Sequence, residues 1–161
     1  MSEHAIAGLF PGQGSHTGAL REQVRRVLPE LLEECDELVG ADAFARAGES
    51  TRFAQPAIFC ASVASWRAHR ASLPAPIALA GHSLGELSAL VAAGALDERA
   101  ALRLAVRRGE LMQSACARRD EGMLAVLGGE DADVQRLARE HRVVLANDNA
   151  PGQIVLAGPL K

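Results

Sequence analysis

The sequence contains little cysteine, and its cysteines are poorly spaced for cross-linking. Only three occur among 161 residues, at Cys35, Cys60 and Cys116, and none forms the short C-x-x-C pair of a zinc site. An odd number of widely separated cysteines predicts neither a disulfide framework nor a metal centre. We therefore expect a reducing, cytoplasmic setting in which all three pack as small buried hydrophobic side chains.

Long hydrophobic runs and blocks of like charge are also missing. The clearest apolar stretch, Leu87–Leu96, falls well short of the roughly 20 residues that cross a bilayer. The first ten residues include an acidic residue and no basic segment, so we expect no signal peptide. Seventeen Lys and Arg are scattered among twenty Asp and Glu, giving a net charge of −3 and no basic stripe to neutralise phosphates. We expect no membrane or nucleic-acid partner.

What the sequence does contain suits one soluble globular domain or part of a larger one. Hydrophobic residues make up 48% of the chain and charged residues 23%, which is too apolar for a disordered protein. Ala5–Phe10 and Ile77–Ala80 are short uncharged runs, typical of buried strands in a parallel sheet. Helical spacing between residues 18 and 39 predicts a helix broken at Pro29, and we expect Pro56 to begin another helix.

The pattern changes towards the end of the chain. Asp97 is a plausible N-cap for a helix that precedes this change. The segments after it have the periods of a small α+β unit. We expect a strand at Met123–Leu127, a helix at Asp131–Glu140, a strand at Val143–Ala146, a turn at Asn147–Gly152 and a strand at Gln153–Ala157.

A five-residue motif joins the second predicted strand to an apolar helix. Gly81-His82-Ser83-Leu84-Gly85 has the G-x-S-x-G pattern of a nucleophile elbow, in which two glycines permit a strained turn that exposes the serine hydroxyl. The N-terminus of the following helix offers N–H groups and a positive dipole end, which stabilise an oxyanion. The pattern alone is common, but its place between strand and helix makes Ser83 a candidate catalytic nucleophile.

An elbow serine needs a base within hydrogen-bond reach. Five histidines are present, and His82, next to Ser83, would point away from it and suits a packing or loop role. His141 is the only histidine downstream, and it lies at a predicted helix end, where a solvated histidine complements the helix dipole. The sequence thus predicts a nucleophile without a convincing base.

Six motifs occur in the order seen in the malonyl-CoA:acyl carrier protein transacylases. The resemblance extends to the acyltransferase domains of polyketide synthases and spans essentially the whole chain. The motifs are Phe10-Pro11-Gly12-Gln13-Gly14-Ser15, Gln55-Pro56-Ala57, Gly81-His82-Ser83-Leu84-Gly85-Glu86, Arg108-Gly109-Glu110-Leu111-Met112-Gln113, Gly122-Met123-Leu124-Ala125 and Asn149-Ala150-Pro151-Gly152-Gln153.

The resemblance implies a role for individual residues. Ser83 matches the serine that takes the malonyl group from malonyl-CoA and passes it to the phosphopantetheine thiol of an acyl carrier protein. Gln13 and Leu84 match the residues whose backbone N–H groups form the oxyanion hole. Arg108 matches the arginine that pairs with the malonyl carboxylate, which its fork can bind through two hydrogen bonds. Gln55 resembles the glutamine of the same pocket, with buried helix capping as the alternative. The resemblance implies no tightly bound cofactor, and the coenzyme A thioester is expected as a substrate.

The resemblance also implies a fold that this chain leaves incomplete. We expect an α/β-hydrolase-like core with a parallel sheet, represented by its N-terminal part in residues 1–121. Residues 122–161 would begin a small ferredoxin-like α+β subdomain. Relatives continue well past Lys161 and carry the general-base histidine there, so we expect the missing C-terminal half or a second polypeptide to complete the domain.

Two other functions fit parts of the sequence. An ordinary α/β-hydrolase, such as an esterase or thioesterase, would use the same elbow, but the chain has no H-G-G-G-type oxyanion loop. A noncatalytic half-domain would explain the missing histidine, yet the elbow, Gln13 and Arg108 argue for chemistry. The sequence leaves open which carrier protein and which malonyl-using pathway are served.

Overall fold

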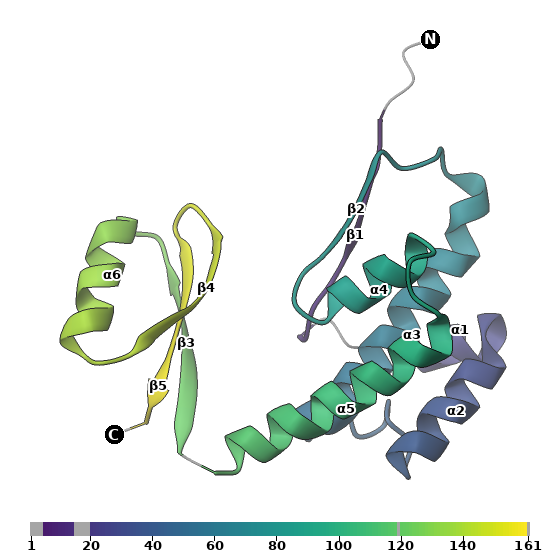
Figure 1. Ribbon diagram of the computed structural model, residues 1–161, viewed down its shortest axis with the longest axis horizontal. Helices are drawn as coiled ribbons and strands as arrows, with labels where there is room; N and C mark the ends of the chain where they lie inside the picture. The colour runs from purple at the N-terminus through teal and green to yellow at the C-terminus, as the bar shows by residue number, and fades with distance from the viewer. Residues whose placement is uncertain (1–4, 15–19, 119, 161) are drawn as a thin grey trace. The chain divides into compact units, whose positions relative to one another are not determined.

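A computed structural model describes residues 5–14, 20–118 and 120–160 (Figure 1). Ser15, His4, His16 and the first two residues of the predicted helical run from 18 to 39 lie outside these ranges. The chain separates into two compact units, Met1–Gln113 and Ser114–Lys161. The division falls near the end of helix α5 (Glu98–Cys116), ahead of the boundary expected after residue 121.

The first unit combines a parallel pair of strands with helices. Strand β1 (Ala7–Phe10) pairs with β2 (Ala78–Gly81), and Phe10 lies opposite Gly81. The unit is thus mixed α/β with a parallel sheet, as predicted. Its helices are α1 (Leu20–Val27), α2 (Pro29–Val39), α3 (Thr51–His69), the short 3₁₀ turn η1 (Arg70–Ser72), α4 (Gly85–Ala92) and α5.

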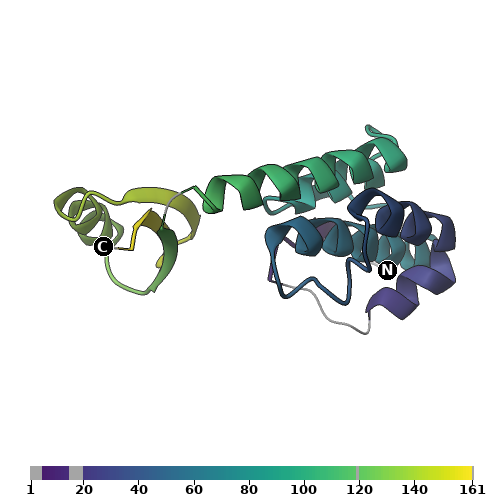
Figure 2. The same cartoon turned by 90° about the horizontal axis from the view of Figure 1, so that it is seen from below.

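The core of this unit lies among its helices, around α3 (Figure 2). Every residue of α3 from Phe53 to Ala64 is buried, as expected of a helix that is apolar on all sides. The helices α1, α2 and α4 pack against it. Phe10 on β1 meets Trp66 of α3 edge to face, with ring centroids 5.9 Å apart, so the strand carrying the first glycine loop is fixed to the central helix.

Two prolines mark helix positions, one as predicted and one not. Pro29 is the first residue of α2, and the helical run breaks there as expected. Pro56, by contrast, lies inside α3, which begins five residues earlier at Thr51. The prediction was wrong because Thr51 and Gln55 are held in the first turns by side-chain hydrogen bonds to α5. Such long-range contacts offset the N–H that proline lacks.

Arg21 connects α1 to α2 and to the loop after α2. Its guanidinium contacts Asp36 and Asp42, each at 2.9 Å. Partial burial acts to raise the pKa of Asp42, but the Ala45 N–H and the Arg21 guanidinium outweigh it and hold that pKa below its ordinary value. The three side chains therefore form a local charged cluster that favours the ionised carboxylate.

The second unit is a three-stranded antiparallel sheet with one helix. Its elements are β3 (Glu121–Leu127), α6 (Asp131–Glu140), β4 (Val144–Ala150) and β5 (Gln153–Pro159), and the strand order is β3-β5-β4. The buried side chains of Val134 and Ala138 on α6 pack with Ile154 and Leu156 on β5. A helix on one face of an antiparallel sheet is the α+β arrangement that the sequence predicts.

One predicted turn in this unit is shorter than expected. The sequence predicts a turn at Asn147 and Asp148, but both residues lie on β4 and pair with β5. Ala150 pairs with Gln153, so the connection is only Pro151-Gly152, and Gly152 has a positive φ, which glycine adopts without strain. Register shifts on either side of Asn147 and Asp148 accommodate these polar residues in the strand.

The cysteines differ in their surroundings. Cys35 and Cys60 are buried, as expected, but Cys116 at the end of α5 is exposed, so the prediction of three buried cysteines was wrong for this residue. Its helix reaches beyond the core of the first unit at that end. A hydrogen bond with Cys35, together with burial, raises the pKa of the Cys60 thiol well above its ordinary value.

Within the described ranges, no helix is both long enough and apolar enough to cross a bilayer. The same residues contain no group of His, Cys, Asp and Glu arranged to hold a metal ion.

Candidate active site

Ser83 occupies a strained turn between β2 and α4. Its φ is +53°, a left-handed value that costs energy for any residue with a side chain. The flanking glycines make the turn possible. A Cβ atom at Gly81 would lie 2.1 Å from the Gly85 carbonyl, and one at Gly85 would lie 2.2 Å from the Phe10 carbonyl oxygen. The predicted nucleophile elbow is therefore formed, and it leaves the Ser83 side chain exposed.

The loop containing Gln13 lies beside this elbow. Because β1 and β2 are parallel and in register, their carboxyl ends meet at one edge of the sheet. The His82 N–H donates to the Phe10 carbonyl at 3.0 Å, and a Cβ atom at Gly12 would lie 2.8 Å from His82 Nδ1. The imidazole of His82 thus lies against the Pro-Gly-Gln-Gly loop. Gln13 and Leu84 each follow one of the two strands at this edge, Gln13 exposed and Leu84 buried.

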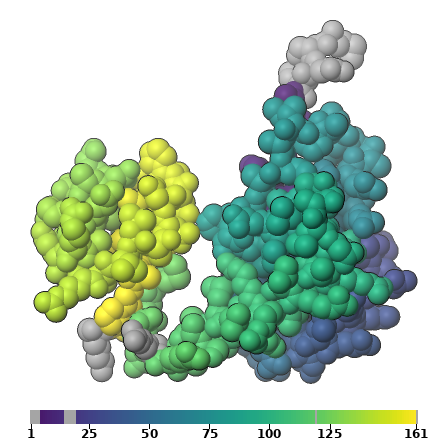
Figure 3. Space-filling view, in the orientation of Figure 1, coloured from purple at the N-terminus to yellow at the C-terminus, as the bar shows by residue number. Residues whose placement is uncertain are grey.

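Arg108 joins the elbow to α3. Its Nη2 donates to Ser83 Oγ at 2.8 Å, and its Nη1 donates to Gln55 Oε1 at 2.7 Å. The structure therefore brings together three of the predicted site residues, which come from α5, α3 and the β2–α4 turn. Helix α5 lies at the surface on the face seen in Figure 3. The side chain of Leu104 on this helix is exposed, whereas Arg108, which contacts the elbow and α3, is half-buried.

This arrangement is suited to an anionic group next to the nucleophile. The guanidinium is always charged, and it lies within hydrogen-bond distance of the hydroxyl that would attack. Gln55 is completely buried, and its carbonyl oxygen holds the other Nη in place. Both amide atoms of Gln55 bind side chains of α5, rather than the backbone at either end of α3. A carboxylate bound by Arg108 would therefore be close to Ser83 Oγ.

Two contacts between α3 and α5 were not predicted. Gln55 Nε2 donates to the thioether sulfur of Met112 at 2.9 Å, and Thr51 Oγ1 donates to the Gly109 carbonyl at 3.1 Å. Met112 follows Arg108 by four residues, so both lie on one face of α5. That spacing, within a motif that already contains the arginine, is the sequence signal that could have identified Met112.

The hydrogen bonds of His69 and His141 are formed within or next to their own helices. His69 ends α3 and bonds the Ser65 carbonyl at 2.8 Å. His141 follows α6 in the second unit and is exposed, and its N–H donates to Leu137 at 2.9 Å. The observed partner of the Ser83 hydroxyl is Arg108. The general-base histidine stays a prediction.

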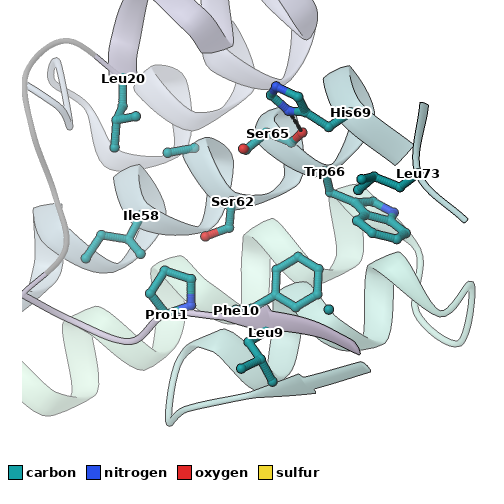
Figure 4. A pocket seen from close by; sticks show the side chains of 12 residues that line it. Leu9, Phe10, Pro11, Leu20, Ile58, Ser62, Ser65, Trp66, His69 and Leu73 are labelled. Carbon is teal, nitrogen blue, oxygen red and sulfur yellow. Dashed lines mark hydrogen bonds between the residues drawn. The ribbon is translucent and has the colours of Figure 1, made fainter. Parts of the chain in front are cut away.

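A separate pocket lies between β1 and α3, with a volume of about 360 Å³ (Figure 4). Its wall is mainly apolar and includes Leu9, Phe10, Ile58 and Trp66. Ser62 also lines it, but none of the five predicted site residues does. The polar cluster at Ser83, and not this pocket, is the place where the predicted chemical groups meet.

Comparison with known proteins identifies the family. The protein-family model described as "Acyl transferase domain" matches residues 19–161. The chain is 41% identical over 170 residues to the polyketide biosynthesis protein ThaF of Burkholderia thailandensis, covering 99% of this chain and 14% of that protein. It is 39% identical over 168 residues to the malonyl CoA-acyl carrier protein transacylase of Escherichia coli, covering 95% of this chain and 54% of that protein.

A solved structure gives the same result at the level of the fold. The crystal structure of MCAT from Mycobacterium tuberculosis matches with a TM-score of 0.85 and 36% identity, covering 98% of this chain and 56% of that one. The chain thus spans about half the length of the transacylases it matches. The family model covers well over half of the chain, so the chain belongs to the acyl transferase domain family.

Proposed function

We propose that this chain is the nucleophile-bearing part of an enzyme that moves a malonyl group from malonyl-CoA to the phosphopantetheine thiol of an acyl carrier protein. The observation that carries the proposal is the 2.8 Å hydrogen bond between Arg108 Nη2 and Ser83 Oγ. In malonyl thioesters a single methylene separates the carboxylate from the carbonyl that is attacked. An arginine adjacent to the nucleophile fits such a short acyl group.

The proposed reaction has two acyl transfers at one serine. Ser83 Oγ attacks the thioester carbonyl, coenzyme A leaves as its thiol, and a malonyl ester remains on the serine. The carrier-protein thiol then attacks that ester and releases Ser83. The backbone N–H groups of Gln13 and Leu84 would stabilise the oxyanion in each step, since both follow strands that end at the elbow. Coenzyme A enters as a thioester substrate, and no tightly bound cofactor is part of the proposal.

We assign the general-base histidine to a part of the protein outside these 161 residues. We place the first unit in an α/β-hydrolase-like core and the second at the start of a ferredoxin-like subdomain, both completed by a C-terminal half or by a second polypeptide that supplies a histidine. Two observations support this assignment. The matched transacylases are about twice as long, and the side chains of Leu9 on β1 and Ile77 before β2 are 78% and 77% exposed. Such apolar side chains beside a sheet normally have neighbours.

Intact-mass spectrometry before and after brief exposure to malonyl-CoA tests the proposal. In the natural protein that contains this chain we expect a malonyl adduct on Ser83 that a pantetheine thiol removes. Ser83→Ala should abolish the adduct, whereas Ser114→Ala, which alters an exposed serine of α5, should not. Transfer to water faster than to the thiol would indicate a hydrolase instead. Absence of any adduct would indicate a noncatalytic domain.

A further inference from the structure

Met112 contacts the site through Gln55 rather than by reaching Ser83 itself. Its thioether sulfur accepts the Gln55 Nε2–H at 2.9 Å, while Gln55 Oε1 accepts from Arg108 at 2.7 Å. Arg108 in turn donates to Ser83 Oγ at 2.8 Å. The four side chains therefore form one continuous chain of hydrogen bonds, with Met112 at one end and the nucleophile at the other.

The donor and acceptor properties of these groups permit only one orientation of the Gln55 amide. A thioether can only accept a hydrogen bond, and a guanidinium can only donate. If the amide were reversed, its oxygen would face the Met112 sulfur and its NH₂ group would face the Arg108 donors, so both contacts would be lost. Because Gln55 is completely buried, water cannot replace them. Met112 therefore helps to select the orientation in which the carbonyl oxygen faces Arg108.

The close packing of α3 and α5 keeps Gln55 within hydrogen-bond distance of Met112. Gly109, between Arg108 and Met112, lies so close to α3 that a Cβ atom there would be 2.7 Å from the Thr51 carbonyl oxygen. The Thr51 hydroxyl also donates to the Gly109 carbonyl at 3.1 Å. The facing turns of α3 and α5 are thus held together on the same side of α5 that carries Met112.

We propose that Met112 is a positioning residue that sets the preference of the site for carboxylated acyl groups. By fixing the Gln55 amide it fixes the Arg108 guanidinium, and so the point at which an acyl carboxylate is bound. This role depends on the proposed function for its substrate, but the hydrogen-bond geometry does not. An acyl group without a carboxylate makes no use of the oriented guanidinium and should not depend on Met112.

The test compares acylation of Ser83 by malonyl-CoA and acetyl-CoA in the natural protein that contains this chain. Met112→Leu keeps the approximate volume and removes the acceptor. We expect the malonyl-to-acetyl rate ratio to fall about fivefold, as for loss of one hydrogen bond, with the acetyl rate nearly unchanged. Selenomethionine at the same position keeps an acceptor and should retain the ratio. Met123 is an exposed methionine of β3, and Met123→Leu is therefore the matched control for loss of a methionine.

A second measurement follows the amide directly and does not require turnover. The side-chain NH₂ of Gln55, assigned in NMR spectra by its loss in Gln55→Ala, should have the chemical shift of a hydrogen-bonded amide in the wild type and the selenomethionine form. Met112→Leu should shift that resonance, because the proton that faces the sulfur loses its acceptor. An unchanged rate ratio, equal losses for malonyl and acetyl, or an unchanged Gln55 amide resonance would each overturn the role of Met112. Failure of the wild-type protein to take up malonyl would overturn the proposed function instead, and the amide measurement would still decide the geometry.

Discussion

Arg108 donates a hydrogen bond from Nη2 to the Ser83 hydroxyl across 25 residues of sequence, at a distance of 2.8 Å. The contact joins a helix that would otherwise be an ordinary basic surface helix to a turn whose geometry favours nucleophilic attack. It gives the site both a reacting group and a positive charge beside it.

Arg108→Ala should reduce acylation of Ser83 by malonyl-CoA about 10- to 100-fold, as expected for loss of hydrogen bonds to a charged group. Acylation by acetyl-CoA should change much less, because acetyl has no carboxylate for the guanidinium to bind. The check is the rate of adduct formation with each thioester, measured by mass spectrometry. Equal losses for both would contradict the assignment of Arg108 to the carboxylate.

Gly85→Ala should lower the free energy of unfolding by about 3 kcal/mol or more, because the added Cβ would lie 2.2 Å from the Phe10 carbonyl oxygen. Gly48→Ala is the matched control. Gly48 is exposed, has nothing within 4 Å of an added Cβ, and should change stability by about 0.5 kcal/mol or less. Urea denaturation measures both. Similar values for the two variants would show that the elbow does not approach β1 so closely.

Protonation of Asp42 should destabilise the protein in acid. Its folded pKa is held below the ordinary value, so its contribution is fully present above the unfolded pKa of about 4. That contribution is lost as the pH falls through the lower folded pKa. Because Asp42 and Arg21 are partly solvated, we expect at most about 1 kcal/mol. Urea midpoints of the wild type and Asp42→Asn should converge as the pH falls below about 4, and a constant difference would refute the pairing.

Cys116 should react with a maleimide in the native protein, whereas Cys35 and Cys60 should not. Cys116 is exposed and the other two are buried, and the raised pKa of Cys60 further reduces its thiolate. Intact mass should show one addition in the wild type and none in Cys116→Ser. Denaturant should then expose the remaining thiols. Rapid native labelling of Cys116→Ser would mean that the α2–α3 core opens readily.

Local patterns predicted many features of this fold because the relevant forces are local. Helix α6 spans Asp131–Glu140 as its apolar spacing indicates, and Asp97 Oδ1 accepts the Ala100 N–H in the predicted cap. The elbow was also predictable, since two glycines around a serine between strand and helix encode the turn directly. In these cases each residue's position depends on neighbours only a few places away.

The features that sequence patterns missed depend on distant contacts. The early start of α3 depends on hydrogen bonds from Thr51 and Gln55 to α5, and the strand positions of Asn147 and Asp148 depend on pairing with β5. The proximity of Gln55, Ser83 and Arg108 could be expected only from the resemblance. The part played by Met112 required the side-chain geometry itself.

The close approach of the elbow to β1 has a consequence for the order of folding. Gly85 packs on the Phe10 carbonyl, and that same carbonyl accepts the His82 N–H. The left-handed turn at Ser83 therefore lacks its supporting contacts with β1 until Phe10 and Gly81 have paired across the intervening chain. Closing so long a loop is slow and entropically unfavourable. A folding intermediate in which β1 has not docked would therefore lack the strained conformation that exposes Ser83.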